Sequence, residues 1–71
     1  MHLYAGKKHQ KYILNDCPND QLLFAMGIRN GLTVSIVTKQ PIGGPIIIRI
    51  KNREIAIDKA LACHITAKAV T

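Results

Sequence analysis

The sequence predicts a mainly β fold, a small and partly open five-stranded barrel with one short α-helix. Three observations support it. The chain has 71 residues, which suits one small domain without room for a deep cleft. Aromatic residues make up only 4% of the chain, so the apolar content is largely aliphatic and β-branched, as strands prefer. Short alternating apolar and polar runs are joined by tight turn signals, a pattern typical of small barrels.

The clearest alternation lies in residues 46–58, where isoleucines recur at every second position. If the chain reverses at Asn52 and Arg53, the isoleucines of both strands share one face and the charged residues share the other. The predicted pairs are Ile50 with Ile55, Ile48 with Ile57, and Lys51 with Glu54. A slip of one residue would expose the isoleucines, so the pattern specifies the faces strongly. Asn52 tolerates the left-handed backbone that such a turn requires.

The elements before this hairpin follow from local signals. We expect residues 1–10 to be a basic arm that can be flexible, followed by a strand at residues 12–14 and a turn cluster at residues 15–20. A short helix over residues 19–26 begins at Asn19 or Asp20, either of which can cap the free amides. Gly27 should end it, with Ile28 folding back on Leu23. Leu22, Leu23 and Met26 form the expected core-facing stripe.

The remaining elements complete the barrel. Leu32, Val34 and Ile36 alternate with polar or smaller residues, which indicates a strand over residues 32–37. Residues 39–45 form a loop in which two glycines permit positive φ. Residues 59–62 can make a single helical turn, and residues 65–70 form a closing strand. The expected inner residues of that strand are Ile65, Ala67 and Ala69.

Charge and targeting signals limit the function classes. The formal net charge is +6, which can reflect an anionic partner such as nucleic acid, an acidic protein surface or a membrane face. The amino terminus lacks an apolar segment of signal-peptide length, and no apolar run approaches the roughly 20 residues that cross a bilayer. We therefore expect a cytoplasmic protein, in which Cys17 and Cys63 are thiols.

The residues that could carry chemistry do not form a recognisable catalytic or metal pattern. The acidic residues show no paired spacing for acid and base catalysis, so we expect no enzyme and no catalytic residue. They are Asp16, Asp20, Glu54 and Asp58. Cys63 and His64 are adjacent, and Cys17, His2 and His9 lie elsewhere. A metal site can be formulated from them. Because neighbouring strand residues point to opposite faces, a core thiol beside a surface imidazole is the preferred interpretation, and no metal ligand or cofactor is assigned.

An ordered set of segments resembles a known family. Residues 23–31 are similar to its helix-end pattern of leucines followed by glycine, an aliphatic residue, two variable positions and a second glycine. Residues 34–37, the loop at residues 41–45, the strand at residues 46–50, and residues 55–57 leading to residues 62–65 match in order and spacing. Together, over residues 22–70, the chain is similar to the ferrous iron transport protein A (FeoA) family.

This resemblance implies an SH3-like barrel, a single domain over residues 1–71, and an accessory role in bacterial ferrous iron uptake beside the membrane permease FeoB. On that basis we expect a protein contact through residues 19–26 and the turn after them. Leu22 and Phe24 are the candidate anchors and Arg29 lies at the rim.

Two other hypotheses stay open. One is a small basic barrel that binds single-stranded nucleic acid, with Tyr4, Tyr12 or Phe24 as stacking surfaces. The other is the metal-responsive barrel of a regulator. Self-association of the barrel is also compatible with the sequence.

Overall fold

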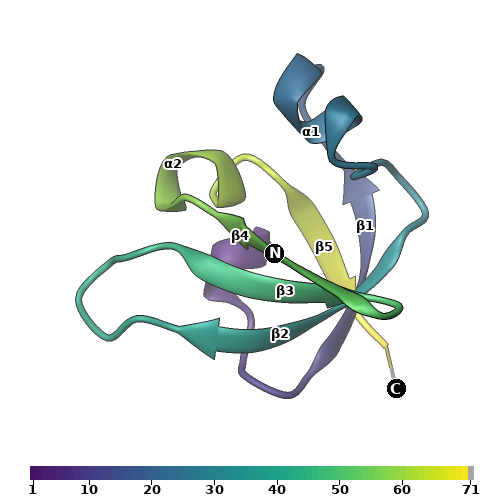
Figure 1. Ribbon diagram of the computed structural model, residues 1–71. Coiled ribbons are helices and arrows are strands. Elements are labelled where there is room, and N and C mark those ends of the chain that lie inside the picture. Colours follow the sequence, from purple (N-terminus) through teal and green to yellow (C-terminus); the bar gives the residue numbers. More distant parts are fainter. Residues whose placement is uncertain (71) are drawn as a thin grey trace.

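The computed structural model describes residues 1–70 and contains five strands, two short α-helices and one 3-10 helix within them (Figure 1). In chain order these are η1 (Leu3–Ala5), β1 (Lys11–Asp16), α1 (Gln21–Ala25), β2 (Thr33–Lys39), β3 (Ile46–Ile50), β4 (Arg53–Ile57), α2 (Lys59–Ala62) and β5 (Thr66–Ala69). The expected five strands and the helix before Gly27 are therefore confirmed. The helical turn expected at residues 59–62 is α2, a second α-helix in addition to the one assigned to the fold class.

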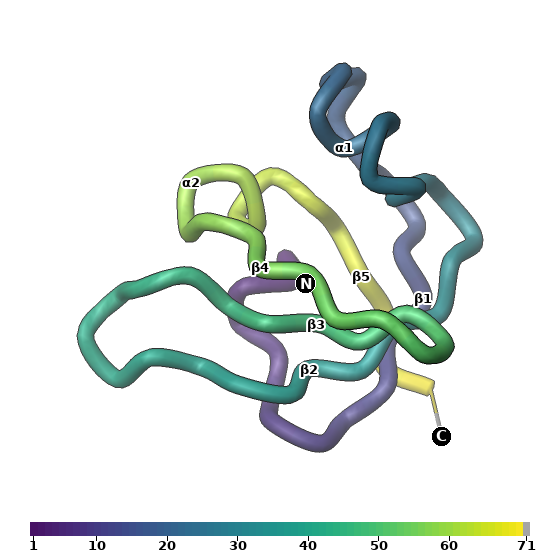
Figure 2. Tube along the Cα trace, in the orientation of Figure 1, coloured from purple at the N-terminus to yellow at the C-terminus, as the bar shows by residue number. Residues whose placement is uncertain are grey.

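All neighbouring strands are antiparallel, in the order β4-β3-β2-β1-β5. The sheet curls around one interior without closing, so β4 and β5 are its edges (Figure 2). Every strand contributes to that interior, and no polar or charged side chain among residues 1–70 is buried in it. The largest fully buried side chains are Leu3, Leu14, Leu23, Val34, Ile36, Ile46, Ile48, Ile57 and Ile65. Aliphatic packing within one curled sheet therefore holds the domain together.

The prediction of a flexible arm at residues 1–10 is wrong for the first residues, which are packed against the rest of the domain. The amide of Leu3 donates to the carbonyl of Ile65 at 2.7 Å, and His2 forms an isolated β-bridge with Thr66. The Leu3 side chain is fully buried, and η1 contacts α2. The amino-terminal segment therefore covers part of the gap at the β5 edge and belongs to the core.

The register predicted for the β3–β4 hairpin is wrong by two residues. The turn is at Lys51 and Asn52, so Ile50 lies opposite Arg53 and Ile48 lies opposite Ile55. The predicted Lys51–Glu54 pair is replaced by an exposed ion pair between Arg49 and Glu54. Lys51, and not Asn52, takes the left-handed backbone, with φ of 56°. A shift of two residues keeps every side chain on its predicted face, which is why the isoleucines still point inward.

The closing strand differs from its prediction at one position. Ile65 and Ala67 are buried as expected, whereas Ala69 is exposed. Ala69 pairs with Tyr12 near the end of the β1–β5 ladder. Tyr12 is buried on β1, whereas Ala69 on the edge strand β5 is not covered.

Candidate partner-binding surface

Helix α1 is short and is fixed at both ends by side-chain and backbone hydrogen bonds. The Asp20 carboxylate accepts from the amides of Leu22 at 2.8 Å and Leu23 at 3.4 Å. Asp20 rather than Asn19 is therefore the cap, and it satisfies donors that a helix start leaves free. At the other end, Gly27 has φ of 80°, its amide donates to Phe24, and the amide of Ile28 donates to Leu23. This is the predicted Schellman ending.

These fixed ends determine which side chains of α1 point outward. Leu23 is only 1% exposed, whereas Leu22 is 59% and Phe24 is 80% exposed. Successive helical residues lie about 100° apart, so only one of these three neighbours can face the core. Leu22 therefore lies outside the predicted core stripe, and Met26 packs at its margin. The two candidate anchors, Leu22 and Phe24, are both accessible.

Arg29 joins two open clefts. The smaller has a volume of about 240 Å³ and is lined by Phe24, Leu23, Ile28 and Arg29 together with residues 17–20 and Asn30. The larger has a volume of about 440 Å³ and lies between the residues after α1 and the β3–β4 turn. The structure thus brings Phe24 and Arg29 to one surface. Leu22 lies on α1 with Phe24 but lines neither cleft.

The larger cleft contains residues that the sequence did not indicate as functional. Lys51 comes from the β3–β4 turn and Arg53 from the start of β4, and Leu32 and Ile50 supply apolar surface. Nη2 of Arg53 donates to the carbonyl of Met26 at 2.7 Å, so the turn is attached to the end of α1. The sequence feature that could have indicated this cleft was a set of three cationic residues around one hairpin, Arg49, Lys51 and Arg53. The two-residue register error hid which of them shares a surface with Arg29.

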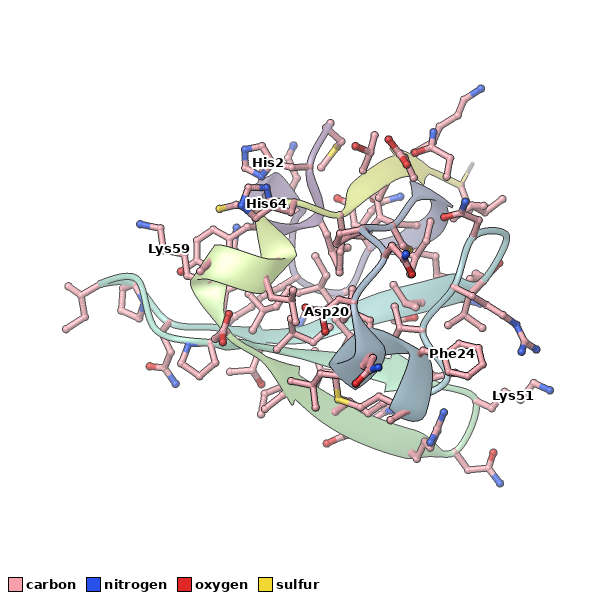
Figure 3. All side chains as sticks on the ribbon, turned by 90° about the horizontal axis from the view of Figure 1, so that it is seen from above. His2, Asp20, Phe24, Lys51, Lys59 and His64 are labelled. Atoms are coloured by element: carbon pink, nitrogen blue, oxygen red, sulfur yellow. The ribbon has the colours of Figure 1, made fainter. Side chains whose placement is uncertain are left out.

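The cysteines and histidines were the residues from which a metal site could be formulated. No group of three or more His, Cys, Asp or Glu side chains with a metal-binding arrangement occurs within residues 1–70. Both cysteines are free thiols of intermediate exposure. Cys63 is the C-cap of α2, not a strand residue, so strand alternation does not govern its orientation relative to His64. His2 and His64 lie close together in the view of Figure 3, on the side away from Phe24.

Cys17 borders the smaller cleft. Burial raises the pKa of its thiol above the ordinary value, and the negative charge of Asp16 raises it further. Both effects disfavour the thiolate, which is the nucleophile and metal ligand. Cys17 is therefore poorly suited to reactive chemistry at neutral pH.

The aromatic residues do not form a platform for bases. Tyr12 is buried, and its hydroxyl oxygen accepts a hydrogen bond from the amide of Lys7 at 2.8 Å. The Tyr4 hydroxyl donates to Gly44 at 2.9 Å, and the Nζ atoms of Lys39 and Lys59 each lie 5.6 Å from its ring centroid. Only Phe24 of the three aromatic residues is freely exposed. Stacking of successive bases, on which single-strand binding depends, is not supported.

None of the helices formed by the described residues has the length and the apolar character that a membrane span requires.

Comparison with known proteins agrees with this fold. A sequence model of the FeoA domain matches residues 1–69. A solved structure of an iron uptake regulatory protein (FeoA) is 30% identical, has a TM-score of 0.85, and is matched over 96% of this chain and 93% of its own. The search of curated proteins finds no match.

Two more distant structures show how widely the fold occurs. The FeoA protein of Stenotrophomonas maltophilia, solved with zinc and described as an SH3 domain protein, is 20% identical with a TM-score of 0.73. It is matched over 96% of this chain and 89% of its own. A manganese-dependent transcriptional repressor is 13% identical with a TM-score of 0.88, and this chain covers 99% of itself but only 41% of the repressor. The fold is thus the SH3-like barrel, and with the family model spanning residues 1–69 the chain belongs to the FeoA domain family.

Proposed function

We propose that this protein is a non-enzymatic accessory factor of bacterial ferrous iron uptake that binds the cytoplasmic part of a FeoB permease. The family membership supports the transport role. The Stenotrophomonas maltophilia relative has itself been described as a candidate activating factor of ferrous iron transport. The contact surface consists of Leu22, Phe24 and Arg29.

The observation that carries the proposal is the exposure of Phe24. This side chain is 80% exposed, on a helix whose Asp20 cap and Gly27 ending fix its direction. A large apolar side chain held outward in a preset orientation loses little freedom on binding. Burying it in a partner would contribute about 1.5–3 kcal/mol. Arg29 at the rim adds a charged donor of the kind that interfaces enrich.

The experiment measures binding of the cytoplasmic part of FeoB to purified variants, with unfolding followed in parallel. We expect Phe24→Ala and Leu22→Asp to keep the unfolding midpoint and to weaken binding at least about tenfold. The matched control is Ile42→Ala, because Ile42 is 95% exposed on the β2–β3 loop, outside the α1 surface. Unchanged binding by Phe24→Ala would refute the surface. Loss of the fold together with binding in Leu22→Asp would make Leu22 a structural residue instead.

A further inference from the structure

We propose that the larger cleft, between the end of α1 and the β3–β4 turn, binds an acidic segment of the partner protein. Carboxylates of that segment contact Arg29, Lys51 and Arg53, and an apolar side chain between them rests on Leu32. The inference rests on the proposed function, because it names the chemistry of the segment that lies beside the Phe24 contact.

The charge of the cleft selects an anionic occupant. The charged side chains lining it, Arg29, Lys51 and Arg53, are all cations. Glu54, the acidic residue next to Arg53, is on the opposite face of β4 and pairs with Arg49. Three cations around one concave surface repel each other and concentrate counter-charge. Because the chain as a whole carries +6, the remaining surface reinforces this preference.

The apolar surface and the size of the cleft favour a peptide over a small anion as its ligand. Leu32 is half-buried at the margin of the core and supplies the accessible apolar surface, whereas Ile50 is itself part of the core and only 4% exposed. The cleft volume of about 440 Å³ exceeds what a single carboxylate needs. Covering the apolar floor requires an apolar group flanked by acidic groups, which an extended protein segment supplies.

One of the three cations, Arg53, is already held in position. The Arg53 guanidinium is attached to the Met26 carbonyl through Nη2, and this bond leaves most of its five N–H donors for a ligand. Planar guanidinium groups bind carboxylates in a bidentate manner. Lys51 lies at the tip of the turn in a left-handed conformation, with φ of 56°, that a non-glycine residue adopts only at some cost. The turn thus presents a cation where glycine or asparagine would be the less strained choice.

The cleft is also continuous with the α1 surface. Arg29 lines both clefts, and Phe24 lines the smaller one. In Figure 3 Phe24 and Lys51 lie on the same side of the molecule, with Lys59 on the other. A single segment of the partner can therefore cover Phe24 and continue into the cationic cleft.

The test uses two fluorescently labelled synthetic peptides and fluorescence anisotropy. In the first peptide glutamates flank a single leucine, and in the second every glutamate is replaced by glutamine. We expect the glutamate peptide to bind at least about tenfold more tightly, with an affinity that falls as salt is raised. We expect the double variant Arg29→Gln, Lys51→Gln to weaken its binding by about fivefold or more. The control Lys7→Gln, Lys8→Gln removes the same charge from two exposed lysines outside the cleft and should change binding less than twofold.

Two outcomes would overturn the inference. Equal binding of the two peptides would show that charge is not recognised. Equal losses in the cleft variant and the Lys7, Lys8 control would show that only net charge matters. Either outcome leaves the FeoB binding assay with Phe24→Ala unaffected, so the proposed function and this inference fail separately. Conversely, the glutamate peptide can bind the cleft even where FeoB does not bind at all.

Discussion

Gly27 lies directly beneath the guanidinium of Arg53, and a Cβ atom built on Gly27 would be 2.6 Å from Nη2. The same glycine has φ of 80° and ends α1, while Nη2 donates to the carbonyl of Met26. One glycine therefore serves two purposes, the helix ending and the attachment of the β3–β4 turn to it.

We expect Gly27→Ala to lower the free energy of unfolding by more than the 1–2 kcal/mol or so that a left-handed alanine costs. The excess arises because the methyl group displaces Arg53 from Met26. Urea denaturation measures the free energy of unfolding of each variant. Gly31→Ala is the matched control, since Gly31 has φ of 88° and no atom within 4 Å of its Cβ position. Equal losses in the two variants would contradict the packing of Arg53 on Gly27, and in an Arg53→Ala background the excess should disappear.

Asp20→Ala should destabilise the protein by about 1 kcal/mol, because the amides of Leu22 and Leu23 lose their acceptor. Asn19→Ala, one residue earlier, should leave stability within about 0.5 kcal/mol. Thermal unfolding of both variants distinguishes the two possible caps. A larger effect at Asn19 would show that the helix begins one residue earlier.

Leu3→Ala should cost about 2–5 kcal/mol, the range for truncating a buried leucine. Ile42→Ala removes a comparable aliphatic side chain at a position that is 95% exposed and should be nearly neutral. Chemical denaturation of both proteins tests whether the amino-terminal segment belongs to the core. Similar stability of the two variants would contradict the packing of Leu3 in the core and would support a flexible arm at residues 1–10.

Lys51→Gly should stabilise the fold by about 0.5–1 kcal/mol. Relief of a left-handed non-glycine residue is worth about 1–2 kcal/mol, and the added freedom of glycine in the unfolded chain offsets about 0.5–1 kcal/mol of that. Asn52→Gly, at the neighbouring turn position where φ is not positive, should only destabilise. Differential scanning calorimetry compares the thermal stability of the two variants. A destabilised Lys51→Gly protein would place the turn elsewhere.

The raised pKa of Cys17 makes a signed prediction about pH. The fold favours the protonated thiol, so this contribution to stability is complete below the pKa of the unfolded thiol and is lost as pH rises through the raised folded value. In a Cys63→Ser background, the ultraviolet absorbance of the thiolate should appear at higher pH in the folded protein than in urea. Asp16→Asn should move the folded midpoint back toward the ordinary value, since it removes the second cause of the shift. A folded midpoint below the unfolded one would contradict the burial of this thiol.

The parts of the fold that depend on neighbouring residues were predictable. The ending of α1 needs only Gly27 and the spacing of Leu23 from Ile28, and both are visible in the sequence. The inward face of β3 and β4 was equally clear from alternation. The turn between them was not, because two registers two residues apart bury the same isoleucines, and the pattern cannot distinguish them. Asparagine is preferred over lysine in the left-handed region of a turn, so the left-handed position was predicted at Asn52 and not at Lys51.

The features that depend on distant residues could not be predicted. Leu3 lies in no alternating or helical apolar pattern, and its backbone partner, Ile65, is at the other end of the domain. For the candidate surface, Phe24 and Arg29 were named from local position and resemblance, and the structure places them on one cleft. The attachment of Arg53 to Met26 required the correct register and the absence of a side chain at Gly27 together.

The hydrogen bond from Leu3 to Ile65 has a consequence for synthesis of the protein. During translation Leu3 leaves the ribosome well before Ile65, which follows it by most of the length of the domain. A nascent chain arrested before Ile65 would keep a leucine in water that the finished barrel hides completely. Packing of the amino-terminal segment is therefore a non-local contact, which forms late because it needs residues from the other end of the domain.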